Sequence, residues 1–210
     1  MASLLSRIDH LVYAAPDLGV AVDHLHAITG VRATPGGEHP GWGTCNALMA
    51  LGESTYLEII GPDPNQRIPS ADLRFGIGDL DQAALVNWAV KTEELEQEVE
   101  EAQLRGLELG PISEGRRKQT NGILLSWRLT APRPSLRDLL PFFIDWGHTT
   151  SPVQGATKGC SLRELRGIHP APDEIRLKLA GLGLDLPISR GSASELVATL
   201  DTPLGKVELR

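Results

Sequence analysis

This sequence has few cysteines and no long apolar run, and each of these absences excludes a class of protein. The 210 residues include two cysteines, Cys45 and Cys160, which form no C-x-x-C pair. A cysteine-based zinc site is therefore excluded, while a disulfide between the two stays open. No apolar run reaches the roughly 18 residues of a membrane span, and the N-terminus lacks the apolar centre of a secretory signal peptide. We therefore expect a cytoplasmic protein that does not enter a membrane.

Positive charge is also in short supply. The 20 Lys and Arg residues are outnumbered by 27 Asp and Glu residues, which gives a formal net charge of −7. Nucleic acid and anionic membranes are poor partners for such a chain. The nearest basic cluster, residues 116–118 (R-R-K), is short and is interpreted as a solvated turn. The motifs of serine hydrolases, zinc proteases and nucleotide-binding proteins are absent as well.

A phrase that occurs twice is the first positive feature. R-G-L-E-L-G-P-I-S-E-G spans residues 105–115, and G-L-G-L-D-L-P-I-S-R-G spans residues 181–191. Such a repeat suggests copies of a larger unit. In both places a helix pattern precedes the phrase and a strand pattern follows it. The phrase therefore marks the exit of a helix into the next strand.

Three segments show the same order of one strand, one helix and three strands. In residues 8–61, a strand pattern precedes a helix that is capped by Asp17 and ends at Gly30. Three more strand patterns then follow. Residues 86–147 and 160–210 repeat this order, although few of their letters match.

These patterns predict an α+β fold of repeated βαβββ modules, two clear and a third at the C-terminus. Their curved mixed sheets surround a cleft, with the helices outside. The predicted boundaries are a paired domain at 5–150, made of module one (8–61), a connector (62–84) and module two (85–147), and a third module at 158–210. We expect a loop at 35–43, a short helix near 79–85, and the third module packed on the paired domain. A homodimer stays open, because an unpaired module would expose an apolar face.

Four segments resemble a known family. R-I-D-H-L-V-Y-A-A-P-D-L-G, G-G-E-H-P-G-W-G-T, T-Y-L-E-I-I-G and L-P-F-F-I-D-W-G begin at residues 7, 36, 55 and 140. Together they are similar to the glyoxalase-like group of the vicinal oxygen chelate superfamily, most specifically within the first 61 residues. The resemblance implies paired modules around a cleft that holds a small molecule. It also implies a lyase, isomerase or dioxygenase with a divalent metal, or a member that binds its ligand without metal.

The resemblance also implies a set of metal ligands on the first and last strand of each module. In module one these positions fall on His10 and Glu58. In module two the first-strand position falls on Asn87 or Trp88, and the last strand offers Asp145. His10, Glu58 and Asp145 would then hold one divalent ion of Zn, Ni, Fe or Mn, or the site would work with none. Buried without a metal, Glu58 or Asp145 could serve as a general base.

Other side chains are candidates for contact with the substrate. His39 and Trp42 lie in the Gly-rich segment and could belong to a lid or to an exposed loop. Trp88 could form a ligand platform or part of the core. Arg128 could bind a carboxylate or phosphate if its strand face lines the cleft, and is otherwise a surface charge.

Two functions remain open at this point. The retained histidine and glutamate of module one favour a metal-assisted lyase, isomerase or dioxygenase. The missing histidine in module two favours a metal-free binding protein, or a metal-independent enzyme with a carboxylate as base. A pure interaction module would need an apolar outer face, which the sequence alone does not reveal.

Overall fold

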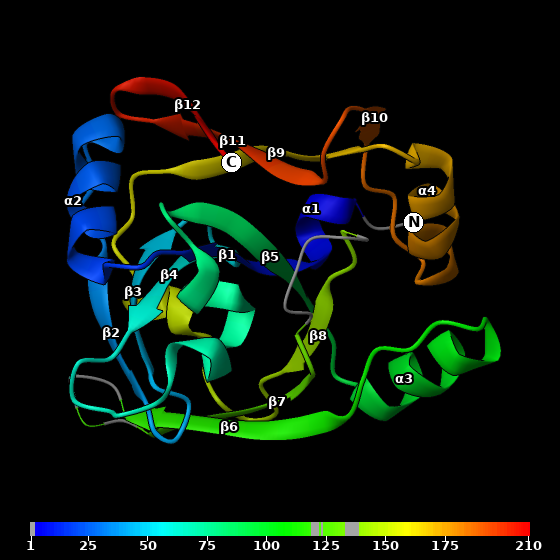
Figure 1. Cartoon of the computed structure of the whole chain (residues 1–210), viewed down its shortest axis with the longest axis horizontal. Coiled ribbons are helices and arrows are strands. Elements are labelled where there is room, and N and C mark those ends of the chain that lie inside the picture. The colour runs from blue at the N-terminus through cyan, green and yellow to red at the C-terminus, as the bar shows by residue number, and fades with distance from the viewer. Residues whose placement is uncertain (1–2, 119–121, 123, 133–138) are drawn as a thin grey trace.

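Two sheets, one of eight strands and one of four, carry the fold of the computed structural model (Figure 1), which describes residues 3–118, 122, 124–132 and 139–210. The helices are α1 (Leu4–Arg7), α2 (Leu18–Thr29), α3 (Leu95–Leu104) and α4 (Pro172–Gly181), with short 3-10 helices η1 (Ser70–Asp72), η2 (Arg74–Asp79) and η3 (Pro152–Gly155). The strands are β1 (Ile8–Ala14), β2 (Thr34–His39), β3 (Thr44–Ala50), β4 (Tyr56–Pro62), β5 (Ala84–Lys91), β6 (Ile112–Lys118), β7 (Leu124–Thr130), β8 (Phe142–Asp145), β9 (Ser161–His169), β10 (Ile188–Arg190), β11 (Glu195–Thr202) and β12 (Gly205–Leu209).

The eight-stranded sheet is built from two modules with the same strand order. Module one contributes β2-β3-β4-β1 and module two contributes β5-β8-β7-β6, joined by the antiparallel pair of β1 and β5. The sheet curls until its end strands β2 and β6 contact each other, with α2 and α3 outside it (Figure 1). The predicted α+β fold of paired βαβββ modules is therefore confirmed.

The C-terminal module repeats the order of elements but not the pairing of strands. Its sheet has the order β10-β9-β11-β12, so β9 pairs with β10 on one side and with β11 on the other. In module one, by contrast, the first strand β1 pairs with the last strand β4. This sheet covers the paired modules from outside: β11 contacts β5, and the Leu85 N–H donates to the Arg210 carbonyl at 2.7 Å. The third module is thus similar in its elements and different in topology.

The repeated phrase has the same local structure in both places. It follows α3 in one case and α4 in the other, where Gly106 and Gly183 adopt φ angles of 73° and 66°. A glycine in this left-handed conformation commonly ends a helix. The next N–H, of Leu107 or Leu184, donates to a carbonyl of the helix at 2.9 Å in both cases. The phrase therefore marks a helix exit, as predicted, even though the following strands join differently arranged sheets.

Two local predictions are wrong. The helical turns of the connector are η1 and η2, which precede the helix expected near 79–85. The segment 35–43, expected as a loop, contains most of β2. That strand tolerates Pro35 and glycine because it stands at the end of the sheet and its pairing with β3 is irregular between Pro35 and Gly37. Along the described residues, no helix combines the length and apolar character that a membrane crossing requires.

Candidate functional site

The inner face of the curled sheet lines a narrow, partly open cavity, in which about 470 Å³ is free of protein atoms when the solvent at its mouth is included. Strands of both modules and the connector between them contribute to its walls. Its polar lining residues are His10, His39, Asn46, Tyr56, Glu58, Arg74 and Arg117, and its aromatic ones are Trp42, Phe75, Trp127, Phe142 and Trp146. Such a mixture of apolar walls and a few polar groups is typical of small-molecule sites.

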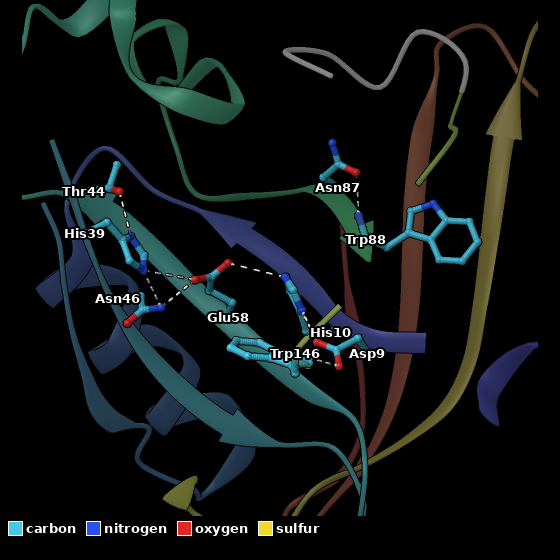
Figure 2. A network of polar contacts seen from close by, with 9 residues as sticks. All are labelled: Asp9, His10, His39, Thr44, Asn46, Glu58, Asn87, Trp88 and Trp146. Carbon is cyan, nitrogen blue, oxygen red and sulfur yellow. Dashed lines mark hydrogen bonds and ion pairs between the residues drawn. The ribbon is translucent and has the colours of Figure 1, made fainter. Parts of the chain in front are cut away.

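Glu58 lies at the centre of the polar network (Figure 2). Its strand, β4, is buried along almost its whole length, and Glu58 itself is 9 % exposed. The Asn46 side-chain amide donates to Glu58 Oε1 at 2.5 Å. The Nε2 atom of His10 lies 3.7 Å from Oε2, and the Nε2 atom of His39 lies 3.8 Å from Oε1. The carboxylate is therefore held by an amide and faces a histidine on each side.

A bulge in β1 orients His10. Neighbouring residues of a strand normally point to opposite faces, but the pairing of β1 with β5 shifts between Ile8 and His10. Asp9 can therefore contact the His10 ring, with Oδ1 2.6 Å from Nδ1, while its other oxygen accepts the Trp146 indole N–H at 3.1 Å. A proton on Nδ1 satisfies Asp9 and directs Nε2 toward Glu58. Because of this bulge, Ile8 does not face the cavity but packs in the outer apolar cluster, which lies between the eight-stranded sheet and the helices and C-terminal sheet outside it.

Two aromatic rings pack against His10 and fix its plane. Tyr56 stacks on it with ring centroids 4.8 Å apart, and Phe142 meets it edge-on at 5.4 Å. Burial, together with the charges of Asp9 and Glu58, raises the pKa of the Tyr56 hydroxyl well above its usual value. Tyr56 therefore stays neutral and serves as a wall.

His39 is buried and neutral at physiological pH. Its Nδ1 atom lies 2.9 Å from Thr44 Oγ1, and its Nε2 atom lies 3.3 Å from the Asn46 amide nitrogen. Burial lowers the pKa of His39 to about 4, against the opposing influence of Glu58 and with the help of Arg117. Because the Asn46 amide can only donate, Nε2 accepts and the proton of His39 sits on Nδ1.

Arg117 is the most unexpected residue of the site. The basic cluster 116–118, interpreted from the sequence as a solvated turn, lies in β6, and Arg117 is 3 % exposed. Its guanidinium lines the cavity and donates to the Gly36 carbonyl of β2, across the junction between the two ends of the sheet. Burial lowers the pKa of Arg117, and Glu58 acts against that shift. The expectation of a solvated turn is wrong, because these residues end strand β6 and the side chain of Arg117 faces the sheet interior.

The connector supplies a second arginine and a strained phenylalanine. Arg74 lies over the ring of Trp42, 3.5 Å from its centroid, and burial lowers the pKa of its guanidinium. Phe75 adopts a φ of 61°, which is rare for a residue with a side chain, and packs on Phe142 at 6.1 Å. Trp42 in turn meets Trp127 edge-on at 6.0 Å. The connector thus closes one wall of the cavity.

Among the residues that the sequence suggested, the structure brings together His10, Glu58, His39 and Trp42. Asp145 lies elsewhere: it accepts the Gly147 N–H at 2.7 Å and lines two other surface hollows.

Arg128 lies outside the cavity too. It forms a surface ion pair with Glu96 and lies 4.0 Å from Asp145. Trp88 is fully buried in the outer apolar cluster, where its indole N–H donates to the Leu139 carbonyl at 2.9 Å. The structure therefore places these candidate substrate contacts away from the cavity that holds Glu58.

The donor set around Glu58 does not fit a tightly held divalent metal. Catalytic zinc sites usually offer three protein ligands. Within the described ranges, no three His, Cys, Asp or Glu side chains are arranged to hold an ion. His10 and His39 face different oxygens of Glu58 from opposite sides (Figure 2), and Nε2 of His39 is already engaged by Asn46. Module two contributes apolar walls and Arg117 in place of further ligands.

Comparisons with known proteins agree with this architecture. Residues 8–183 match the family model described as a glyoxalase-like domain. A crystal structure of a hypothetical protein from Staphylococcus aureus has a TM-score of 0.67 at 15% identity, over 90% of this chain and 87% of that one. Methylmalonyl-CoA epimerase from Mycobacterium tuberculosis has a TM-score of 0.45 at 17% identity, over 70% and 92%. No curated protein matches the chain at a significant level. Because the family model spans most of the sequence, the chain belongs to the glyoxalase-like domain family of the vicinal oxygen chelate superfamily.

Proposed function

We propose that this protein is an enzyme that moves a proton on a small molecule bound in the cavity, with Glu58 as the base and without a metal. The observation that carries the proposal is the buried carboxylate of Glu58, which Asn46 holds at 2.5 Å and which faces Nε2 of His10 at 3.7 Å. A carboxylate fixed in a cavity with mostly apolar walls is suited to general base catalysis.

The step that this geometry supports is removal of a proton from a carbon next to a carbonyl group. The C–H bond breaks, an O–H bond forms on Glu58, and the electron pair moves to the carbonyl oxygen as an enolate. Return of the proton to either face of the carbon gives an isomerisation or epimerisation. Loss of a leaving group from the next carbon gives a lyase reaction. The negative charge that develops on the oxygen would be stabilised by Arg117 and Arg74, which line the same cavity.

His10 and Asp9 have supporting roles in this scheme. His10 faces Glu58 with Nε2 and can exchange a proton with it, so that the base is restored after each turnover. Asp9 is a positioning residue, because it fixes the ring of His10 through Nδ1 at 2.6 Å. Such a carboxylate–histidine pair sets both the tautomer and the orientation of the ring.

The test is deuterium incorporation from D₂O into a panel of small ketones, 2-oxo acids and 1,3-dicarbonyl compounds, followed by proton NMR. We expect the wild type to exchange the protons next to the carbonyl of at least one compound. The Glu58→Gln variant should lose about 100-fold or more of that rate. Asp145→Asn is the matched control, because this carboxylate lies outside the cavity, and its rate should be unchanged.

Three results would contradict the proposal. One is exchange that survives in Glu58→Gln. Another is exchange that is lost in the control variant Asp145→Asn as well as in Glu58→Gln. The third is exchange that disappears after dialysis against a chelator and returns with a divalent metal, which would restore the metal-assisted alternative.

The aromatic walls support one other function, a protein that binds a small ligand without changing it. Trp42 and Trp127 both line the cavity and pack edge to face there. Saturable binding of panel compounds with no exchange for any of them would favour this alternative.

A further inference from the structure

The charges that line the cavity are not balanced. Two guanidinium groups, of Arg74 and Arg117, and one carboxylate, of Glu58, contribute to its walls. His39 is neutral at physiological pH because burial holds its pKa near 4. Asp9 lies behind His10, and its two oxygens contact His10 and Trp146. Among the lining residues the guanidinium groups therefore outnumber the carboxylates by one, with the Asp9 carboxylate one layer behind.

Both arginines are held in place by contacts that leave them in the cavity wall. Arg117 extends from β6 and donates to the Gly36 carbonyl, while Arg74 extends from η2 and stacks on Trp42 at 3.5 Å. Burial lowers the pKa of each guanidinium, which means that the surroundings disfavour its positive charge. A ligand with a negative charge would compensate both groups.

We infer that the cavity takes a small carboxylic acid, whose carboxylate binds to Arg117 and Arg74 and whose planar body contacts the rings of Trp42 and Trp127. This inference deepens the proposed function, because it names the substrate class of the same cavity. Guanidinium groups match carboxylates in geometry and form charge-assisted hydrogen bonds with them. The two tryptophan rings line the same cavity and lie at 82° to each other, so a flat ligand can pack against one ring and meet the edge of the other.

The charge balance favours a carboxylate over a phosphate. The lining has one guanidinium more than carboxylates, and the Asp9 carboxylate lies close behind it, so a ligand of charge −1 is better accommodated than a phosphate monoester, which carries about −1.5 to −2 at neutral pH. The additional charge would be repelled by the buried carboxylate of Glu58, which lines the same narrow cavity. A 2-oxo acid or an aromatic acid also fits the enolate chemistry proposed above or the aromatic walls.

The test is a fluorescence titration of the full chain, since Trp42, Trp127 and Trp146 line the cavity. The probes are benzoate and pyruvate, their neutral amides benzamide and pyruvamide, and phenyl phosphate. We expect at least one of the two acids to change the fluorescence with saturation. Its amide should bind about tenfold or more weakly, because a charge-assisted bond is lost. Phenyl phosphate should bind more weakly than benzoate.

Three variants assign the effect to particular charges. Arg74→Gln should weaken acid binding by about tenfold and leave amide binding unchanged. Arg128→Gln is the matched control, because this arginine lies on the surface beside Glu96, and its affinities should equal those of the wild type. Glu58→Gln should tighten acid binding, because it removes the nearby negative charge. Arg74 is chosen over Arg117 because it does not link the two ends of the sheet.

The outcomes separate this inference from the proposed function. Any of four results would overturn the inference. Two concern the acids: no saturable change with benzoate or pyruvate, or equal affinity for an acid and its amide. The other two are tighter binding of phenyl phosphate than of benzoate, and an Arg74→Gln variant with unchanged acid affinity. Acid binding that depends on Arg74, without deuterium exchange in any panel compound, would support the inference and contradict the proposed function. Glu58-dependent exchange confined to neutral compounds would support the proposed function and contradict the inference.

Discussion

Burial of His39 should make the stability of the protein depend on pH in a defined window. The pKa of His39 is lowered from 6.5 to about 4 in the folded chain, mainly because burial disfavours the charged ring. Between these two values the unfolded chain binds a proton that the folded chain does not, so the free energy of unfolding falls as the pH falls. The full contribution is present above pH 6.5, and about 3 kcal/mol is lost by pH 4, since one pKa unit corresponds to about 1.4 kcal/mol.

Urea denaturation at several pH values measures the free energy of unfolding of the wild type and of His39→Gln. The carboxylates titrate in both proteins, so their contribution cancels in the difference. A glutamine stays neutral at every pH, so the difference between wild type and variant should shift by about 3 kcal/mol between pH 6.5 and pH 4. Replacing His24, an exposed histidine of α2, by glutamine is the control and should leave the curve unchanged. A flat difference between wild type and His39→Gln, or an NMR titration of His39 near 6.5, would refute the reasoning.

Three glycine substitutions give further expected outcomes. A Cβ at Gly36 would lie 2.1 Å from Asn46 Oδ1, so Gly36→Ala should displace the amide and lower the deuterium-exchange rate by about tenfold or more, as measured by NMR. A Cβ at Gly115 would lie 2.3 Å from the Trp127 ring, so Gly115→Ala should weaken benzoate binding in the fluorescence titration. Gly106→Ala meets no atom within 4 Å but keeps a φ of 73°, so urea denaturation should show a loss of about 1 kcal/mol from backbone strain alone. Unchanged values would contradict each argument.

Periodicity predicted most elements of the fold, apart from β2 and the helical turns of the connector, but not all of their partners. Alternation in strands and the apolar face of α2, from Asp17 to Gly30, depend on neighbours in sequence, and they appear where the pattern placed them. The pairing of β9 with β11 depends on contacts far apart in the chain. An identical order of elements is compatible with either strand order, which is why the topology of the third module could not be predicted.

A site residue could be predicted from the sequence where its strand is regular, because neighbouring side chains then point to opposite faces of the sheet. Glu58 stands among apolar neighbours of β4, and this contrast marked it as a candidate. Asp9 was missed because a bulge, which alternation cannot reveal, brings it beside His10. Arg117 was missed because a run of basic residues usually lies in solvent, and only the curl of the sheet places one of them inside. Gly115 and Arg117 stand two residues apart and so share one face of β6. Gly115 has no side chain and leaves room there for Trp127, which was a local sign that this face points inward.

The closure of the curled sheet has a consequence for its motion. In the described part of the chain, β2 and β6 are the two ends of the sheet, and a hydrogen bond from the Arg117 side chain to the Gly36 carbonyl spans the gap between them. Because the described residues of these two strands meet without a ladder of backbone hydrogen bonds, this junction should open more easily than a paired strand edge, and its amide hydrogens should exchange with solvent early. A ligand that draws on the same guanidinium would alter this junction. Ligand binding in the cavity should therefore change the amide hydrogen exchange rates of β2, although β2 belongs to module one and Arg117 to module two.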